Sequence, residues 1–272
     1  MNLGFGLGLQ YSKLNGIGFV GMLNKFPNAS LGLSLDKLDK NYTGSCINVR
    51  RSSDNNQLDI GFVNGILDTA SLLDFVGSGD GFVSIIYDQV GSNNMIQNLA
   101  SLQGQIVFNG SLILKGGKPC IIRSVDNGGG YLSTYAPNDG VEVKGMFYVG
   151  DNEGKSGVLF GSDLGTRDFG FVAQSGSTNT AVDNNPTISL TKLNGSTTTI
   201  TTRGEVFTAT DNQFLLYREI EFNFENNVLG LGYNQNNPLN FGMFTFQELV
   251  IFENTDDAVA KENNINSRYN IY

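Results

Sequence analysis

Short stretches in which apolar and polar residues alternate run along most of the chain, and this period of two predicts strands that bury one face. Residues 46–51 alternate in this way, whereas residues 82–86 form an almost continuous apolar run that is typical of a fully buried strand. Between them, an apolar stripe at helical spacing predicts a short helix that has Thr69 as its N-cap and ends at Gly77. The stretch 42–89 is therefore predicted to fold as strand, turn, helix and strand.

Turn-forming dipeptides divide the chain after this stretch. Asn109-Gly110 predicts a hairpin within residues 105–114, and Asn194-Gly195 predicts another that leads into the threonine-rich run 196–202. Further strands are predicted at residues 31–35, 141–148, 157–160, 169–173, 188–193 and 244–252.

The closing segment predicts a strand followed by a helix. Thr255 and the two aspartates after it suit the start of that helix, and Val259 and Ile265 are predicted to face the core. With 35 glycines and only 5 prolines, the whole pattern predicts a mainly β chain, an antiparallel β-sandwich with two short helices.

The amino terminus differs from the rest of the chain. Residues 3–9 alternate a large apolar residue with glycine, which predicts an extended ribbon with one bare backbone face. We interpret residues 1–34 as an attachment arm, with a loosely ordered leader as the alternative. A signal peptide is disfavoured because no basic region opens the chain, and no apolar run approaches the ~20 residues of a membrane span.

The charge and the cysteines exclude several classes of protein. A net charge of −9 and a pI near 4.5 disfavour a nucleic-acid groove or an anionic membrane as partner. Cys46 and Cys120 stand in unrelated contexts, so we predict buried free thiols, with a disulfide as the alternative. The chain has no histidine and no closely spaced cysteines, which removes the usual zinc spacings.

Several short sequence motifs resemble those of a known module. The words YTG, INVRRSSDN, LDTASLLDFVG and GDGFVSIIYDQ within residues 42–89 resemble the module of fungal α-L-arabinofuranosidase B that recurs in structural proteins of tailed bacteriophages. The end of the chain, FQELVIFENTDDAVAKENNINSRYNIY, is similar to the closing strand and helix of concanavalin-like, laminin-G-like sandwiches in phage virion proteins. The resemblance implies a concanavalin-like jelly roll over residues 35–272 in a phage virion, and it implies no reaction.

We carry three functions forward as expectations. The first is a fibre or surface appendage, fastened to other virion proteins by the arm, in a homo-oligomer such as a trimer, whose lectin-like face binds a host-surface glycan. The second is a purely structural head-fibre, capsid-decoration or tail-adaptor protein without a ligand. The third is a glycoside hydrolase of the arabinofuranosidase type. We expect a non-enzymatic protein exposed on the particle surface.

One strand carries candidate catalytic carboxylates. Alternation places Glu219, Glu221 and Glu225 on one face, and neighbours two apart on a strand lie ~6–7 Å apart, close to the spacing used in retaining glycoside hydrolysis. Some concanavalin-like glycosidases carry a similar acidic strand, although the order of acidic residues in this chain differs from their motifs. The alternative is an amphipathic strand with a solvated acidic face. The resemblance carries over no arabinofuranosidase catalytic residue.

Ligand-binding candidates are fewer. Tryptophan is absent, so stacking against a sugar would fall to tyrosines, with core packing as their alternative role. The candidates are Tyr131, Tyr135, Tyr148 and Tyr233. The acidic turns at 126–127 and 151–153 offer oxygen ligands for Ca²⁺, with plain solvated loops as the alternative.

The adjacent Arg50 and Arg51 allow two interpretations. They bind an anionic ligand, or one of them forms a structural pin with an aspartate such as Asp54 or Asp88. We favour the pin, because buried arginines persist only when they are paired.

Overall fold

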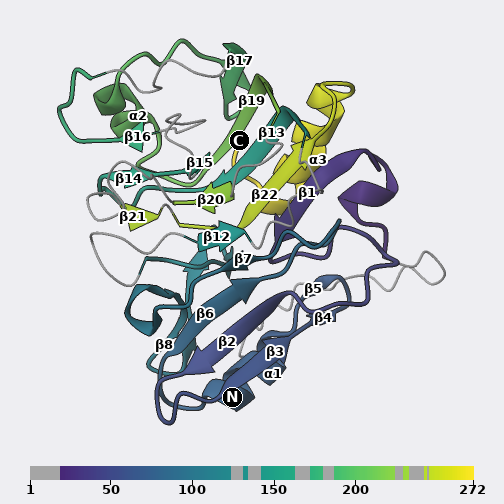
Figure 1. Ribbon diagram of the computed structural model, residues 1–272, viewed down its shortest axis with the longest axis vertical. Coiled ribbons are helices and arrows are strands. Elements are labelled where there is room, and N and C mark those ends of the chain that lie inside the picture. Colours follow the sequence, from purple (N-terminus) through teal and green to yellow (C-terminus); the bar gives the residue numbers. More distant parts are fainter. Residues whose placement is uncertain are drawn as a thin grey trace, which may run out of the picture.

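The computed structural model in Figure 1 describes most of the chain, namely residues 19–123, 131–133, 142–162, 172–179, 187–223, 229–232, 242–243 and 245–272. These residues form many short β-strands and three α-helices. Among the described strands, the pairings are antiparallel except between β14 (Gly157–Val158) and β21 (Gly242–Met243), which run parallel. The predicted mainly β, antiparallel character is therefore confirmed.

A sheet of six described strands fills the upper half of Figure 1. Its order is β1 (Ala29–Ser34), β22 (Glu248–Phe252), β13 (Glu142–Gly150), β19 (Phe214–Asn223), β17 (Thr187–Leu193) and β18 (Ser196–Thr197). Successive residues of β22 enter two different buried clusters, so both faces of this sheet are covered. That double burial explains the continuous apolar run predicted near the end of the chain. The predicted hairpin is present, with Asn194 and Gly195 at positive φ between β17 and β18.

The second large sheet contains nine described strands. The main path runs β15 (Phe160–Ser162), β20 (Leu229–Leu231), β12 (Tyr131–Ser133), β7 (Met95–Ile96), β6 (Gly81–Ile86), β2 (Ile47–Arg51) and β3 (Gln57–Ile60). Its strands β6, β2 and β3 lie below the first sheet in Figure 1. The hairpin of β8 (Gly104–Phe108) and β9 (Ser111–Leu112) attaches to β6. The predicted turn at Asn109-Gly110 is confirmed, since both residues have positive φ, as a two-residue hairpin turn requires.

Smaller elements complete the described structure. They are the pairs β4 (Phe62–Val63) with β5 (Ile66–Leu67) and β10 (Leu114–Lys115) with β11 (Lys118–Pro119), strand β16 (Val172–Ala173) beside β14, and 3-10 helices at Met22–Asn24 and Ala100–Leu102. In the part of the chain described here, no helix is long and apolar enough to cross a membrane.

One hydrophobic core joins the two large sheets. It contains Ile47 and Val49 of β2 together with Leu249 and Ile251 of β22, all with at most 1% of their surface exposed. The module predicted at 42–89 and the end of the chain therefore share a core. A second cluster covers the outer face of the six-stranded sheet, where Ile265 of α3 (Ala258–Tyr269) packs.

Three helix predictions need correction. Helix α1 (Thr69–Val76) is capped by Asp68, whose Oδ1 accepts the Ser71 N–H at 3.1 Å, so Thr69 is the first helical residue and not the cap. Helix α2 (Arg203–Ala209) was not predicted. Its signal was present, because Thr202 and Glu205 form a capping box.

The third correction concerns α3. Ile265 is buried as predicted, but Val259 is 59% exposed and does not face the core. Val259 lies in the first turn of α3 beside Ala258, which packs against the buried cluster, so that Val259 is on the solvent-facing side of this turn.

A group of charges centred on the buried Glu248 links α3 to the six-stranded sheet. Arg268 donates two hydrogen bonds to the carboxylate of Glu248, with Nη1–Oε2 at 2.6 Å and Nη2–Oε1 at 2.5 Å. Asp36 lies 3.5 Å from Arg268 and 2.6 Å from the Lys118 ammonium. Glu248 is fully buried, and Ser34 also donates to it at 2.7 Å. We call Arg268, Glu248, Asp36 and Lys118 the helix clasp.

Candidate functional site

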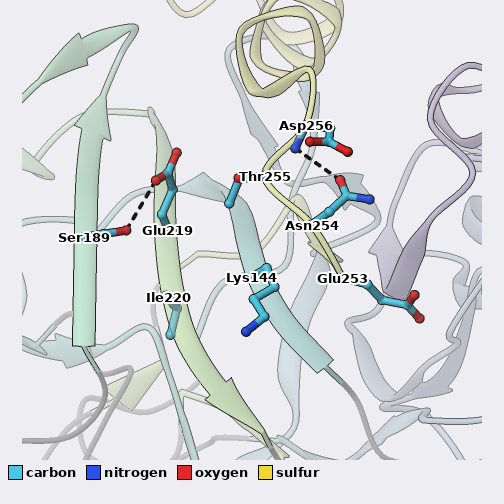
Figure 2. A pocket seen from close by; sticks show the side chains of 8 residues that line it. All are labelled: Lys144, Ser189, Glu219, Ile220, Glu253, Asn254, Thr255 and Asp256. Atoms are coloured by element: carbon cyan, nitrogen blue, oxygen red, sulfur yellow. Dashed lines mark hydrogen bonds between the residues drawn. The ribbon is translucent and has the colours of Figure 1, made fainter.

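A polar hollow of about 350 Å³ opens on the outer face of the six-stranded sheet, beside the start of α3 (Figure 2). Its walls come from β13, β17, β19 and the loop between β22 and α3. The lining residues are Lys144, Ser189, Glu219, Ile220, Glu253, Asn254, Thr255 and Asp256. The volume lies in the range of small-molecule sites.

Two irregularities in the sheet meet at this hollow. The register of β13 against β19 shifts between Val143 and Gly145, and that of β17 against β19 shifts between Ile188 and Leu190. Bulges of this kind bend a strand and redirect its side chains, and they are frequent beside active sites. The hollow is therefore a consequence of local departures from the regular ladder.

Glu219 occupies the edge of the hollow and is held by two hydroxyl groups. The Tyr217 hydroxyl donates to Oε1 at 2.9 Å, and the Ser189 hydroxyl donates to Oε2 at 3.3 Å. Figure 2 shows Ser189 and Glu219 facing each other across neighbouring strands. Burial, and then the hydrogen bond to Glu219, raises the pKa of Tyr217, which keeps that hydroxyl a donor. The carboxylate is thus positioned as a hydrogen-bond acceptor.

The other charged groups of the hollow are spread around it. Lys144 comes from the bulged part of β13, and the exposed carboxylates of Glu253 and Asp256 come from the loop before α3. Figure 2 shows the Glu253 side chain pointing away from Glu219. The hollow therefore offers hydrogen-bonding groups of both kinds to a hydroxyl-rich ligand, and it shows no converging pair of carboxylates among the described side chains.

The predicted acidic face of β19 is only partly described. The bulge breaks strict alternation between Glu219 and Phe222, because three steps of β19 oppose two of β13. The backbone of Glu221 pairs with Thr187, but its side chain lies outside the described residues, as does all of Glu225. Glu219 is therefore the candidate carboxylate that the structure places.

The two adjacent arginines lie at the end of β2. Arg51 forms an ion pair with Asp54 at 2.6 Å, and its guanidinium lies 4.9 Å from the Phe75 ring centre. Arg50 donates to Gln103 Oε1 at 2.8 Å and lies over another aromatic ring. The hydrogen bond from Arg51 lowers the pKa of Asp54 to about 2. Both partners of the ion pair remain partly exposed.

Asp88 caps an edge strand. Its carboxylate accepts the N–H of Gly32 in β1 at 2.9 Å, and the N–H groups of Val90, Gly91 and Asn93 at 3.0–3.2 Å. Burial raises the pKa of Asp88, while these backbone donors act in the opposite direction. The residue therefore ties the end of β6 to β1, and the ion pair of the predicted pin is formed with Asp54.

The tyrosine candidates do not form a sugar platform where they are described. Tyr131 and Tyr148 are fully buried, and their hydroxyls donate to the carbonyls of Val83 and Thr245, each at 2.8 Å. A sugar cannot stack on a ring that has no exposed surface, so the alternative role in the core applies. The candidates Tyr135 and Tyr233 lie outside the described residues.

The acidic turn after β13 is occupied by protein groups. The Lys115 ammonium lies 2.7 Å from Asp151 Oδ2, and the Glu153 N–H donates to Asp151 Oδ1 at 2.9 Å. Asn152 Oδ1 accepts the Gly154 N–H at 2.8 Å. Among the described residues no group of three or more His, Cys, Asp or Glu side chains is arranged to hold a metal ion. The other predicted turn, 126–127, lies outside them.

The two cysteines are free and buried, as predicted. Burial raises the pKa of both thiols, so that neither is poised as a thiolate. Cys46 packs in the main core, where its Sγ lies 3.3 Å from the Ser34 carbonyl oxygen.

The sequence did not indicate most of the hollow. Lys144, Ser189 and Asp256 come from segments far apart in the chain, and no local pattern connects them. The signal available in the sequence was the acidic strand that contains Glu219.

Comparison with known proteins gives a likeness in fold. No protein-family model matches the chain, and no curated protein matches it. Solved structures do match. An arabinofuranosidase complexed with arabinofuranosyl-α-1,2-xylobiose superposes with a TM-score of 0.54 at 17% identity, over 87% of this chain.

Two further structures agree. A GH54 α-L-arabinofuranosidase soaked with a cyclic sulfate inhibitor gives a TM-score of 0.52, and a mutant of such an enzyme soaked with 4-nitrophenyl α-L-arabinofuranoside gives 0.53, both at 17% identity and 87% coverage of this chain. This chain spans 62% of the length of each of these structures. The arabinofuranosidase resemblance seen in the sequence is therefore matched at the level of fold.

Proposed function

We propose that the protein is a carbohydrate-binding component of a bacteriophage particle, and that it recognises a glycan through the hollow of Figure 2. The observation that carries this proposal is Glu219, a carboxylate fixed by two hydroxyl donors in a polar hollow, on a fold shared with arabinofuranosidases. A fixed acceptor of this kind suits a vicinal diol of a sugar.

The surrounding groups support sugar binding. Asn254 and Thr255 present short polar side chains, and Lys144 supplies an ammonium group on the opposite side from Ser189. Ile220 gives a small apolar contact. The hydroxyl groups of a pentose or hexose ring can bind such a mixture of hydrogen-bonding groups.

The setting in a virion follows from the sequence resemblance. In this proposal the body is a concanavalin-like, laminin-G-like sandwich that includes β1, the part of the predicted arm that precedes β1 attaches it to other virion proteins, and a trimer displays several copies of the hollow. Several weak sites on one particle strengthen adhesion through avidity. The host glycan is the proposed ligand.

A glycan array probed with the full chain tests this function. We expect binding to a limited set of glycans, and Glu219→Gln to weaken it by at least about tenfold, because a charge-assisted hydrogen bond contributes about 1.5–3 kcal/mol. Asp211→Asn, which alters an exposed carboxylate outside the hollow, is the matched control. Absence of binding at millimolar glycan would instead favour the purely structural role.

A glycoside hydrolase is the second candidate, favoured by the fold comparison with arabinofuranosidases. It predicts release of 4-nitrophenol from 4-nitrophenyl α-L-arabinofuranoside, with loss of activity in Glu221→Gln or Glu219→Gln. Glycan binding without cleavage of this substrate or of arabinose-containing polysaccharides would favour the binding protein. We expect that outcome, because the described part of the hollow lacks a converging pair of carboxylates.

A further inference from the structure

A second hollow, of about 440 Å³, lies at the β4–β5 hairpin, away from the residues that line the hollow of Figure 2. It is lined by Phe19, Lys37, Lys40, Asn41, Phe62, Asn64 and Gly65. We call it the lysine–phenylalanine groove. None of these residues takes part in the proposed glycan site, and the groove has a different chemical character.

The aromatic walls of the groove are held in place. A Cβ on Gly65 would lie 2.3 Å from ring carbons of Phe19, so the Phe19 ring packs directly on the glycine backbone. Gly65 also has φ +82°, a conformation that disfavours other residues. On the other side, the Phe62 ring meets Tyr42 edge to face, with ring centres 6.2 Å apart. Walls fixed in this way lose little entropy when a ligand binds.

The positive charge of the groove comes from Lys37 and Lys40. The Lys37 ammonium donates to the Lys40 carbonyl oxygen at 3.1 Å. Within the part of the chain that the structure describes, no carboxylate forms an ion pair with Lys37 or Lys40. The nearest acid in sequence, Asp39, accepts hydrogen bonds from Asn24 Nδ2 and the Asn41 N–H.

This concentration of positive charge stands out in a chain with a net charge of −9. Two ammonium groups beside two aromatic rings and two amide side chains complement a ring-shaped molecule that carries an anion. We propose that the lysine–phenylalanine groove binds an anionic sugar, a pyranose that bears a carboxylate or a sulfate group. The lysines bind the anion, the phenylalanines pack on the ring, and Asn41 and Asn64 bind the hydroxyl groups.

Isothermal titration of the full chain tests the proposal. The probes are trigalacturonate for the carboxylate, a chondroitin 4-sulfate tetrasaccharide for the sulfate, neutral xylotriose and inorganic sulfate. We expect at least one of the two anionic sugars to bind, more weakly at high salt, and xylotriose and inorganic sulfate to bind at least about tenfold more weakly. The anionic probe that binds identifies the charged group.

Two variants locate the binding. Lys37→Ala/Lys40→Ala is expected to weaken binding of the anionic sugar at least about tenfold, and Phe19→Ala to weaken it while leaving the thermal midpoint near that of the wild type. Lys25→Ala, an exposed lysine outside the groove, is the matched control and leaves binding unchanged.

Three results overturn the proposal: no anionic sugar binds at millimolar concentration, xylotriose or inorganic sulfate binds equally well, or the double lysine variant binds as the wild type does. Glu219→Gln separates this site from the proposed glycan site. It leaves binding in the groove intact, so either site can fail without the other.

Discussion

Arginine–carboxylate pairs occur in two regions of this molecule and differ in burial. In the helix clasp, the Arg268 side chain, which is 22% exposed, meets Glu248, whose side chain has no exposed surface. At the end of β2, Arg51 meets Asp54, and the two side chains are 31% and 40% exposed. The closest N–O distances are nearly equal, at 2.5 and 2.6 Å. The distances alone therefore do not tell which pair contributes more to stability.

The expected contribution of each pair to stability depends on burial, because burial decides whether water can solvate the partner that remains when the other is removed. Water solvates Asp54 once Arg51 is gone, so an exposed pair contributes little. Water does not reach Glu248 in the same way, and a buried carboxylate without its cation is strongly destabilising. Burial lowers the pKa of Arg268, but the charge of Glu248 and its hydrogen bonds outweigh that effect and raise it overall. The clasp is therefore predicted to fix α3 to the sheet.

The largest expected effect is that of Arg268→Met. Among the described residues, the change leaves Glu248 buried with two side-chain donors, the hydroxyls of Ser34 at 2.7 Å and Tyr269 at 3.3 Å. We expect the free energy of unfolding, measured by urea denaturation at neutral pH, to fall by about 3–5 kcal/mol.

The double variant Arg268→Met/Glu248→Leu is the control for this prediction. It removes both charges and is expected to recover part of the loss, since an apolar pair of similar volume replaces a buried ion pair at little cost. A double variant that is less stable than Arg268→Met alone would show that the clasp does not act through an uncompensated charge.

The sequence analysis identified the region whose ion pair is expected to contribute less to the free energy of unfolding. Arg50 and Arg51 are adjacent and precede a polar turn, so that a local pattern reveals them. The clasp joins Asp36, which follows β1, with Glu248 of β22 and Arg268 of α3, and no spacing in the chain connects these positions. Local turn chemistry is readable from a sequence, whereas a long-range ion network depends on how the sheets pair.

The same division applies to the fold and to the candidate site. The hairpins at Asn109-Gly110 and Asn194-Gly195, and the apolar strand β22, were predicted because their signals lie within a few residues. The hollow beside Glu219 was not, because it is created by register shifts between strands that are distant in sequence. Alternation predicted an unbroken acidic face there, and a bulge interrupts it.

A much smaller effect is expected from Arg51→Ala. The variant loses the ion pair with Asp54, a hydrogen bond to the Phe75 carbonyl oxygen at 3.1 Å and the contact with the Phe75 ring. Because both charged groups reach solvent, we expect the free energy of unfolding to fall by only a small fraction of the loss in Arg268→Met. If Arg51→Ala and Arg268→Met lowered the free energy of unfolding equally, burial would not explain a difference between the two ion pairs.

The smallest effect is the pH dependence of the Arg51–Asp54 pair. The hydrogen bond from Arg51 lowers the pKa of Asp54 from 3.8 to about 2. A folded-state pKa below the unfolded one means that the carboxylate stabilises the fold at a pH above 3.8, and that this contribution disappears as the pH falls through about 2. Thermal unfolding of the wild type and of Asp54→Asn isolates it, because other titrating groups are common to both proteins. We expect the wild type to have the higher midpoint above pH 3.8 and the difference to shrink steadily toward pH 2. If the difference in midpoint stayed constant over this range, the stabilising effect of Asp54 would not depend on its charge.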